Sequence, residues 1–504
     1  MNHDYTRIES DIALNGLFSE YLPPCFKMNR SALCNGPSDH CDLIPPYSFT
    51  MSRFSSDGSR RSIYIPEVGS YVVTRNYVKQ EHIIDDLIRF TESSNNSFSP
   101  ILGSEDTIMM HEQVYNSGIS SITGNPSDYI ENVAKKIIKA TGSTRVLKLD
   151  IANCYASFYM HMAPAILLGL ERADEEYSKT LSRDDTEPID PVYTRYANLD
   201  RIIRQQNLNR TNGILTGPLY SRIIIEAILT RIDIELKEAG LSFSRYSDDY
   251  EVYLRTENVD TVISTFEAIL KRYGFSLNYE KKQLVDFPYY VIENLSKLFK
   301  DHSEGNLHTE ELMSLFDTFQ KLEKDGTKGA IRFLLKSIET NPIDTENTEL
   351  YKAYLLTILA SNERSLVKAC SILIEHQEKL CLTNQDVDLI TQMLTHHIQC
   401  GHDLETVWLL YLLIMTNHQL TCHIDLILDS DNELAQTILL CKNLLTAEHS
   451  SRLAHKASSW LLLYELYATG LINEADFIER LKIHHNLSMY QKLKQRNAHF
   501  CVFP

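Results

Sequence analysis

The sequence predicts an α+β domain followed by a domain built only of helices, and three observations support this. Alternating aromatic and branched residues between Phe243 and Leu254 flank an adjacent pair of aspartates, which indicates a β-hairpin with two carboxylates at its tip. The apolar run from Val146 to Ile151 indicates a buried strand that ends near Asp150. Beyond residue 290, apolar residues recur at helical spacing with no strand pattern. We therefore divide the chain into a loop-rich N-terminal region (1–55), an α+β domain (56–290) and an α-helical repeat domain (291–504).

Composition limits the partners that this chain can have. Its 504 residues suffice for two or three domains, and its net charge of −18 is spread evenly along the sequence. A protein that grips a long duplex needs a broad basic surface, so we expect any nucleic-acid cleft to be local and narrow. Ten cysteines without a paired framework suggest a reduced, cytoplasmic protein. We expect no signal peptide, because Met1 to Glu20 is polar and acidic. We also expect no membrane partner, because the longest apolar run, Val407 to Met415, is too short to cross a bilayer.

Three carboxylates form the candidate catalytic centre. Asp248 and Asp249 would repel each other at an exposed turn, and a divalent cation such as Mg²⁺ or Mn²⁺ would relieve that repulsion. If Asp150 faces them across a sheet, the set could hold two ions. Lys281, near the tip of a later strand-turn, could donate a proton to a leaving pyrophosphate. The alternatives are an ordinary hydrophilic turn, an Asp150 that caps a helix over 151–160, and a solvated lysine.

Two further segments could contact a nucleotide. Arg60 and Arg61 should project from opposite sides of a hairpin arm, where one arginine could bind a triphosphate through both of its terminal nitrogens. Gly213 and Gly217 precede a helix that begins near residue 220, and such glycines let backbone approach a ligand closely. The alternatives are a solvated arginine pair on an edge strand and a simple capped turn.

The order of these motifs resembles the fingers and palm of reverse transcriptases. Within that superfamily the chain looks most like the bacterial abortive-infection (Abi) polymerases of the AbiK group, and closest to the smaller, prophage-encoded type. The reverse-transcriptase resemblance rests on Arg61-x-x-x-x-Pro66, Asp150 with Tyr155, the Gly213/Gly217/Ser221 loop, Tyr246-x-Asp248-Asp249 and Asn278-x-x-Lys281. The narrower resemblance rests on the segment from Asp150 to His161, on Ser221-Arg222 with Glu226, and on Lys328 to Ile331.

The resemblance implies a reverse-transcriptase-like fingers and palm followed by an all-α helical-repeat domain. It also implies template-independent, protein-primed DNA synthesis in phage defence, with two Mg²⁺ or Mn²⁺ ions as cofactors. The expected partners are dNTPs, a single-stranded DNA product attached covalently to the protein, and further copies of the chain in a trimer or hexamer. The implied roles are metal binding by Asp150, Asp248 and Asp249, and dNTP binding by Arg61, Tyr155, Gly217, Ser221 and Lys281, with Tyr155 excluding ribonucleotides. Leu215 and Cys154 depart from the usual pattern, which affects base stacking rather than metal ligands.

Protein priming requires a tyrosine that can enter the site. The candidates are Tyr5, Tyr21 and Tyr47, because the N-terminal region should be the most mobile part of the chain. A templated reverse transcriptase of the retron kind is an alternative, but the Val-Thr-Gly motif expected of retrons is absent. The other alternative is a catalytically idle palm whose helical domain acts as a scaffold or sensor.

Several remaining patterns predict structure rather than catalysis. Residues 125–140 should form a helix with Ile130, Val133, Ile137 and Ile138 on one face, and residues 171–191 should form a solvated acidic loop. Two groups could be interpreted as metal clusters: Cys25, Cys34, His40 and Cys41, whose spacing is irregular, and His396, His397 and His402, which lie at helix ends where histidines are usually structural.

Overall fold

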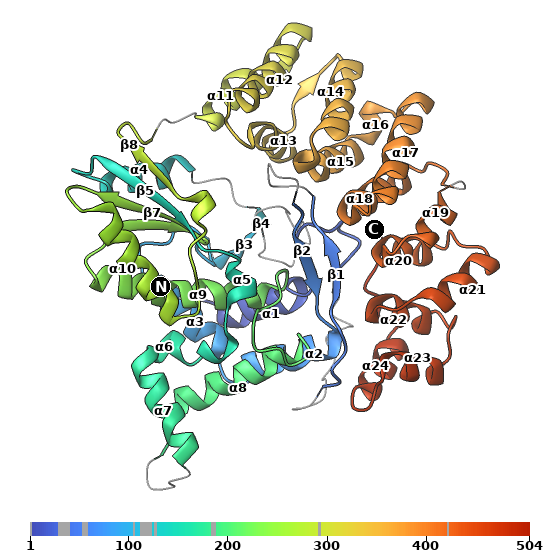
Figure 1. Ribbon diagram of the computed structural model, residues 1–504. Coiled ribbons are helices and arrows are strands. Elements are labelled where there is room, and N and C mark those ends of the chain that lie inside the picture. The colour runs from blue at the N-terminus through green and yellow to red at the C-terminus, as the bar shows by residue number, and fades with distance from the viewer. Residues whose placement is uncertain are drawn as a thin grey trace.

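The computed structural model describes residues 3–28, 41–52, 59–103, 106–110, 123–124, 129–182, 188–290, 294–420 and 423–503. The largest sheet belongs to an α+β part of the molecule, and an arc of helices from α11 to α24 runs beside this part (Figure 1). The hairpin β1–β2 lies between that arc and the rest of the α+β part.

The central sheet has four strands in the order β6-β7-β5-β8, and all neighbours are antiparallel. Their bounds are β5 (Arg145–Asp150), β6 (Phe243–Tyr246), β7 (Asp249–Leu254) and β8 (Gln283–Asp286). In the register of this sheet, Asp249 lies opposite both Asp150 and Tyr246. The predicted hairpin and the predicted strand therefore bring their aspartates to the same end of the sheet.

Helix α9 (Leu219–Glu238) forms the centre of the α+β core. Fourteen of its residues are buried, including Ile223, Ile228 and Ile232, and a helix that is apolar on all sides belongs inside a protein. It contacts α3 and α10. The helices of this part are α1 (Tyr5–Asn15), α2 (Val68–Gln80), α3 (Ile83–Glu92), α4 (Tyr129–Lys139), α5 (Cys154–Ser157), α6 (Ala165–Leu168), α7 (Leu170–Ser182), α8 (Pro191–Gln205), α9 and α10 (Val259–Arg272).

The hairpin of β1 (Tyr47–Thr50) and β2 (Ser62–Ile65) contacts both halves of the molecule. On one side, the Tyr64 amide donates a hydrogen bond to the Thr216 carbonyl at 2.8 Å, in the loop before α9. On the other side, β1 contacts α18. The hairpin therefore links the helical arc to the loop before α9.

The region after residue 290 is helical except for two short strands, as the sequence predicts for the residues described there. Neighbouring helices pack on one another along the arc. Their bounds are α11 (Leu295–Ser303), α12 (Thr309–Lys324), α13 (Ala330–Thr340), α14 (Thr348–Ser361), α15 (Leu366–Glu375), α16 (Gln377–Leu380), α17 (Asn384–Gln399), α18 (Asp403–Met415), α19 (Ile424–Asp429), α20 (Glu433–Cys441), α21 (Ala447–Lys456), α22 (Trp460–Ala468), α23 (Glu474–Leu481) and α24 (Leu487–Gln495). The short strands β9 (Asn306–Leu307) and β10 (Asp344–Thr345) pair with each other.

The segment beyond α24 returns to the N-terminal region. The Lys27 amide donates to the Phe500 carbonyl at 3.1 Å, and the Val502 amide donates to the Cys25 carbonyl at 2.8 Å. Nearby, Glu67 at the start of α2 accepts a hydrogen bond from the Tyr490 hydroxyl at 2.5 Å. The C-terminal end of the arc therefore contacts the N-terminal region and the start of α2.

Three local predictions were wrong. The N-terminal region contains α1, whose Ile8 and Ile12 are buried, so it is less loop-rich than expected. Residues 170–182 form α7 rather than a loop, because Leu170 and Ala173 still give this acidic segment a buried face. The apolar face expected on α4 is buried only at Val133, and Ile138 is 71% exposed. No helix among the described residues is long and apolar enough to span a bilayer.

Candidate active site

Three carboxylates meet at the end of the central sheet. Each of Asp150, Asp248 and Asp249 offers one oxygen, and these oxygens all lie within 4.8 Å of one another. Asp150 is 4% exposed at the end of β5, whereas Asp249 at the start of β7 is exposed. The sequence predicted this convergence, and the sheet register produces it.

The electrostatics of the cluster favour a cation. Burial and the nearby charge of Asp150 raise the pKa of Asp248. Burial, together with the charges of Asp248 and Asp150, raises the pKa of Asp249 to about 6. Closely spaced carboxylates repel one another when they are ionised, and they offer hard oxygen ligands. They therefore fit a divalent ion such as Mg²⁺ or Mn²⁺. The residues present therefore suit the metal that the sequence predicts.

Lys281 supplies one positive charge to the same cluster. It belongs to a short 3₁₀ turn over Tyr279–Lys281, and its Nζ donates to Asp150 Oδ1 at 2.9 Å. The Asn278 amide also donates to the Asp150 carbonyl, at 2.8 Å, which holds this turn against β5. The predicted proximity of Lys281 to the site is thus observed, although its partner is a carboxylate ligand.

A buried arginine holds the turn that carries the aspartates, a role that the sequence pattern did not reveal. Arg245 is fully buried and contacts Asp233 through Nε at 2.9 Å and Glu226 through both terminal nitrogens at 2.8 and 2.9 Å. Its Nη1 also donates to the Ser247 carbonyl at 3.0 Å. Ser247 has a φ of 55°, a left-handed conformation that a turn needs and that this hydrogen bond supports. Only the closeness of an arginine to the aspartate pair hinted at this role.

Arg60 and Arg61, which were predicted to project from opposite sides of the hairpin arm, have different surroundings. Arg60 forms ion pairs with Glu405 at 2.6 Å and Glu363 at 2.9 Å, both in the helical arc. Arg61 is exposed and lies close enough to Asp248 to oppose the rise of its pKa. Arg60 therefore anchors the hairpin, and Arg61 remains on the side of the carboxylates.

Tyr155 and the glycine loop are joined by a main-chain hydrogen bond. Tyr155, in α5, is partly buried, and its carbonyl accepts a hydrogen bond from the Ile214 amide at 2.9 Å. Gly217 has a φ of 131°, and a Cβ there would lie 2.5 Å from the Tyr64 carbonyl oxygen. The close approach that Gly217 permits is therefore to strand β2 of the same chain, not to an exposed ligand surface. Ser221 is 2% exposed in the first turn of α9, so it lies behind the surface.

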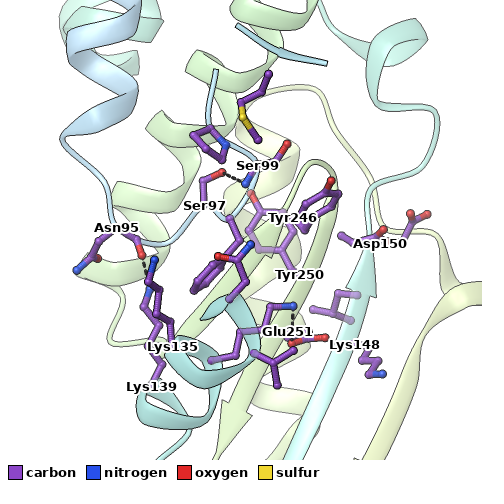
Figure 2. A pocket seen from close by; sticks show the side chains of 18 of the residues that line it. Asn95, Ser97, Ser99, Lys135, Lys139, Lys148, Asp150, Tyr246, Tyr250 and Glu251 are labelled. Carbon is purple, nitrogen blue, oxygen red and sulfur yellow. Dashed lines mark hydrogen bonds and ion pairs between the residues drawn. The ribbon is translucent and has the colours of Figure 1, made fainter. Parts of the chain in front are cut away.

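A cavity of about 1230 Å³ opens beside the carboxylates. Asp150 at the end of β5 and Lys135 and Lys139 on α4 border the same space (Figure 2). Tyr246, 43% exposed, also lines it. The charged residues of its described lining are Lys135, Lys136, Lys139, Lys148, Arg222, Lys281 and Lys336 against Asp150, Asp249 and Glu251. Seven basic groups against three acidic ones give this space the opposite charge balance to that of the whole chain.

The three candidate priming tyrosines have different surroundings. Tyr5 receives a hydrogen bond from Arg89 at 3.1 Å, and Tyr47 faces the first turn of α20, where burial raises its pKa. Burial also raises the pKa of Tyr21, but Arg332, Arg222 and Arg61 lie near enough to oppose that rise. Two of those arginines, Arg222 and Arg61, also lie at the candidate site, so Tyr21 shares two charged neighbours with it.

The two cysteine and histidine groups have separate outcomes. Cys34 and His40 lie outside the described residues, and the Cys41 thiol donates to Gln205 at 3.2 Å. His397 and His402 do meet, with their Nδ1 atoms 2.9 Å apart. The sequence analysis treated them as isolated structural histidines, and it did not consider the acidic residue that lies beside them.

No protein-family model and no curated protein matches the chain. Among solved structures, telomerase from Candida albicans in complex with a TWJ fragment of telomeric RNA aligns over 81% of this chain and 66% of its own, with 11% identity and a TM-score of 0.30. Apo telomerase from Candida tropicalis aligns over 75% and 69%, with 11% identity and a TM-score of 0.33. The chain thus spans about two thirds of the length of these two telomerase chains.

Proposed function

We propose that the chain is a metal-dependent nucleotidyltransferase of the reverse-transcriptase type that adds deoxynucleotides to a hydroxyl group. One observation carries this: three carboxylates from neighbouring strands converge within 4.8 Å beside a basic cavity. Two bound ions would supply the Lewis acidity that activates the hydroxyl and neutralises the pyrophosphate. Asp150 and Asp248 would hold them, with Asp249 assisting.

In this proposal the incoming nucleotide and the acceptor strand bind on different sides of the carboxylates. Arg61 is exposed and lies near Asp248, and it would bind the triphosphate of the incoming nucleotide. The basic cavity on the Asp249 side is suited to the phosphates of the acceptor strand, because a polyanion needs cationic neighbours. Lys281 would leave Asp150 when metal binds, and it could then neutralise or protonate the leaving group.

The test is incubation of purified protein with labelled dNTPs and Mg²⁺, with and without added primer and RNA template. Incorporation without either supports untemplated synthesis, incorporation only with template supports the retron-like alternative, and no incorporation under any condition contradicts the proposal. Asp248→Asn should abolish incorporation. Asp286→Asn is the matched control, since Asp286 lies opposite Arg145 at the far end of the same sheet.

Protein priming adds a second, separable proposal. We infer that the priming hydroxyl belongs to Tyr5, Tyr21 or Tyr47 in the N-terminal region. Active protein should then carry DNA that survives denaturation, and one of Tyr5→Phe, Tyr21→Phe and Tyr47→Phe should remove it while the other two do not. An unmodified intact mass in an active preparation would contradict protein priming and leave the transferase proposal standing.

A role in phage defence follows from the resemblance and not from the site. We propose that bacteria expressing the chain resist infection through the same chemistry. Phage plating efficiency should fall with the wild-type chain and return to normal with Asp248→Asn. Equal protection by both would instead favour a scaffold or sensor role.

A further inference from the structure

A second cluster of metal-ligating side chains lies at the junction of the β1–β2 hairpin and the helical arc. His397 is near the end of α17, His402 immediately precedes α18, and Glu405 is in the first turn of α18. Each offers a ligand atom, and these atoms all lie within 4.8 Å of one another. Residues from two successive helices and their connection therefore converge on one point.

Glu405 has a carboxylate oxygen that the described residues leave unused. The residue is 0% exposed, and its Oε1 accepts a hydrogen bond from Arg60 Nη1 at 2.6 Å. Its Oε2 is buried and has no hydrogen-bond partner among the described residues. A buried polar atom without a partner destabilises the folded state, so its presence needs an explanation.

The two imidazole rings present ligand nitrogens toward each other. The Nδ1 atoms of His397 and His402 are 2.9 Å apart, and His397 is only 7% exposed. A neutral imidazole is the form that binds a metal.

We propose that His397 Nδ1, His402 Nδ1 and Glu405 Oε2 bind one divalent transition-metal ion of the zinc class, with water as the fourth ligand. Two imidazoles and one carboxylate are a common tetrahedral donor set for zinc, whereas Mg²⁺ prefers oxygen ligands alone. The single N–H shared between the two Nδ1 atoms would move to Nε2 of its own ring, so no net proton is released. Glu405 is already a carboxylate because it pairs with Arg60.

Arg60 would then orient the Glu405 carboxylate that binds the metal. A carboxylate that binds a metal through one oxygen and a hydrogen-bond donor through the other is held in one orientation. Thr50 of β1 contacts the same helix start, because its amide donates to Asp403 Oδ2 at 2.8 Å. The ion would thus stabilise the start of α18, which contacts Thr50 in β1 and Arg60 just before β2. Arg60 is the neighbour of Arg61 in the sequence.

Cobalt substitution tests this site without relying on catalysis. The full-length protein is titrated with Co²⁺ in excess Mg²⁺, which occupies the oxygen-only carboxylates of Asp150, Asp248 and Asp249. Tetrahedral Co²⁺ has intense visible absorption, whereas octahedral Co²⁺ bound to oxygen absorbs weakly. We expect the wild type to show the intense bands at one equivalent and to lose them when Zn²⁺ is added.

Variants distinguish this ligand set from adventitious binding. His402→Asn and Glu405→Gln should lose the bands and the rise in melting temperature caused by Zn²⁺. His396→Asn is the matched control, because that exposed ring lies next to His397, with centroids 5.4 Å apart, but contributes no ligand to the proposed set. A wild type without the bands, or a His402→Asn protein that binds Co²⁺ as the control does, would overturn the assignment. Circular dichroism confirms that each variant is folded before titration.

Discussion

The guanidinium group of Arg245 donates a hydrogen bond to the main-chain carbonyl of Ser247, 3.0 Å away. Through this contact a fully buried side chain reaches the turn that presents Asp248 and Asp249. The same guanidinium neutralises Glu226 and Asp233, both on α9. The position of the turn that carries Asp248 and Asp249 is therefore linked to the central helix of the core.

Replacing Arg245 should destabilise the protein strongly. Arg245→Met leaves two buried carboxylates without their partner, and breaking a buried ion pair costs about 3–5 kcal/mol. Urea unfolding should show this loss. The triple change Glu226→Gln, Asp233→Asn and Arg245→Met should recover much of it, since no isolated charge remains. A single variant as stable as the wild type would show that the network contributes little.

The raised pKa of Asp249 predicts a pH-dependent stability. Its pKa rises from 3.8 to about 6, so folding favours the protonated carboxyl. The stabilising contribution of this group is complete below the unfolded-state pKa and is lost as pH rises through about 6. Asp249→Asn should therefore melt at a higher temperature than the wild type above that pH, and the gap should close in acid. Added Mg²⁺ should narrow the gap at high pH, and a gap independent of pH would contradict the assignment.

Arg60 and Arg61 should give opposite results although they are adjacent. Arg61→Ala should raise the KM for dNTP at least ~10-fold, equivalent to ~1.4 kcal/mol, without changing the melting temperature. Arg60→Ala should lower the melting temperature, because it removes the partner of the buried Glu405 carboxylate. Steady-state kinetics and differential scanning fluorimetry on both proteins check this. Similar effects from both substitutions would refute the division of roles.

Tyr155→Ala should weaken discrimination against ribonucleotides. The ring is partly buried near Asp248, where it could exclude a 2′-hydroxyl. Competition between rNTPs and dNTPs should show ribonucleotide incorporation that the wild type lacks. Tyr159→Ala is a suitable control, because Tyr159 is also partly buried but lines a different pocket. Unchanged selectivity in Tyr155→Ala would place the selective contact elsewhere.

The chain should associate with itself into a trimer or hexamer. Its exposed large apolar residues include Ile138 on α4 and Leu471 after α22, which a closed assembly could cover. Light scattering coupled to size-exclusion chromatography measures the mass directly. A monomer at micromolar concentration would contradict this prediction.

Local patterns in the sequence were enough to find the carboxylates. Asp150 follows a short apolar strand, and Asp248 and Asp249 interrupt a clear alternation, so neighbouring residues alone indicate their positions. The buried face of α7 was missed because most of its residues are charged. The face of α4 was misjudged because an apolar stripe does not specify what covers it.

Contacts between distant segments were beyond the reach of sequence patterns. Glu405 binds Arg60 across 345 positions, and neither residue carries a local sign of that pairing. Arg245 looked like an ordinary strand residue, since Glu226 and Asp233 lie on a separate helix. Gly217 was expected to let backbone approach a ligand, and in the structure its close neighbour is the Tyr64 carbonyl.

The hydrogen bonds between residues 25–27 and residues 500–502 have a consequence for biosynthesis. During translation the N-terminal segment leaves the ribosome long before its partner strand exists. The hairpin that carries Arg61 likewise waits for α18, and Glu67 waits for Tyr490. The nascent α+β part therefore cannot complete these contacts until α18, α24 and residues 500–502 have been synthesised.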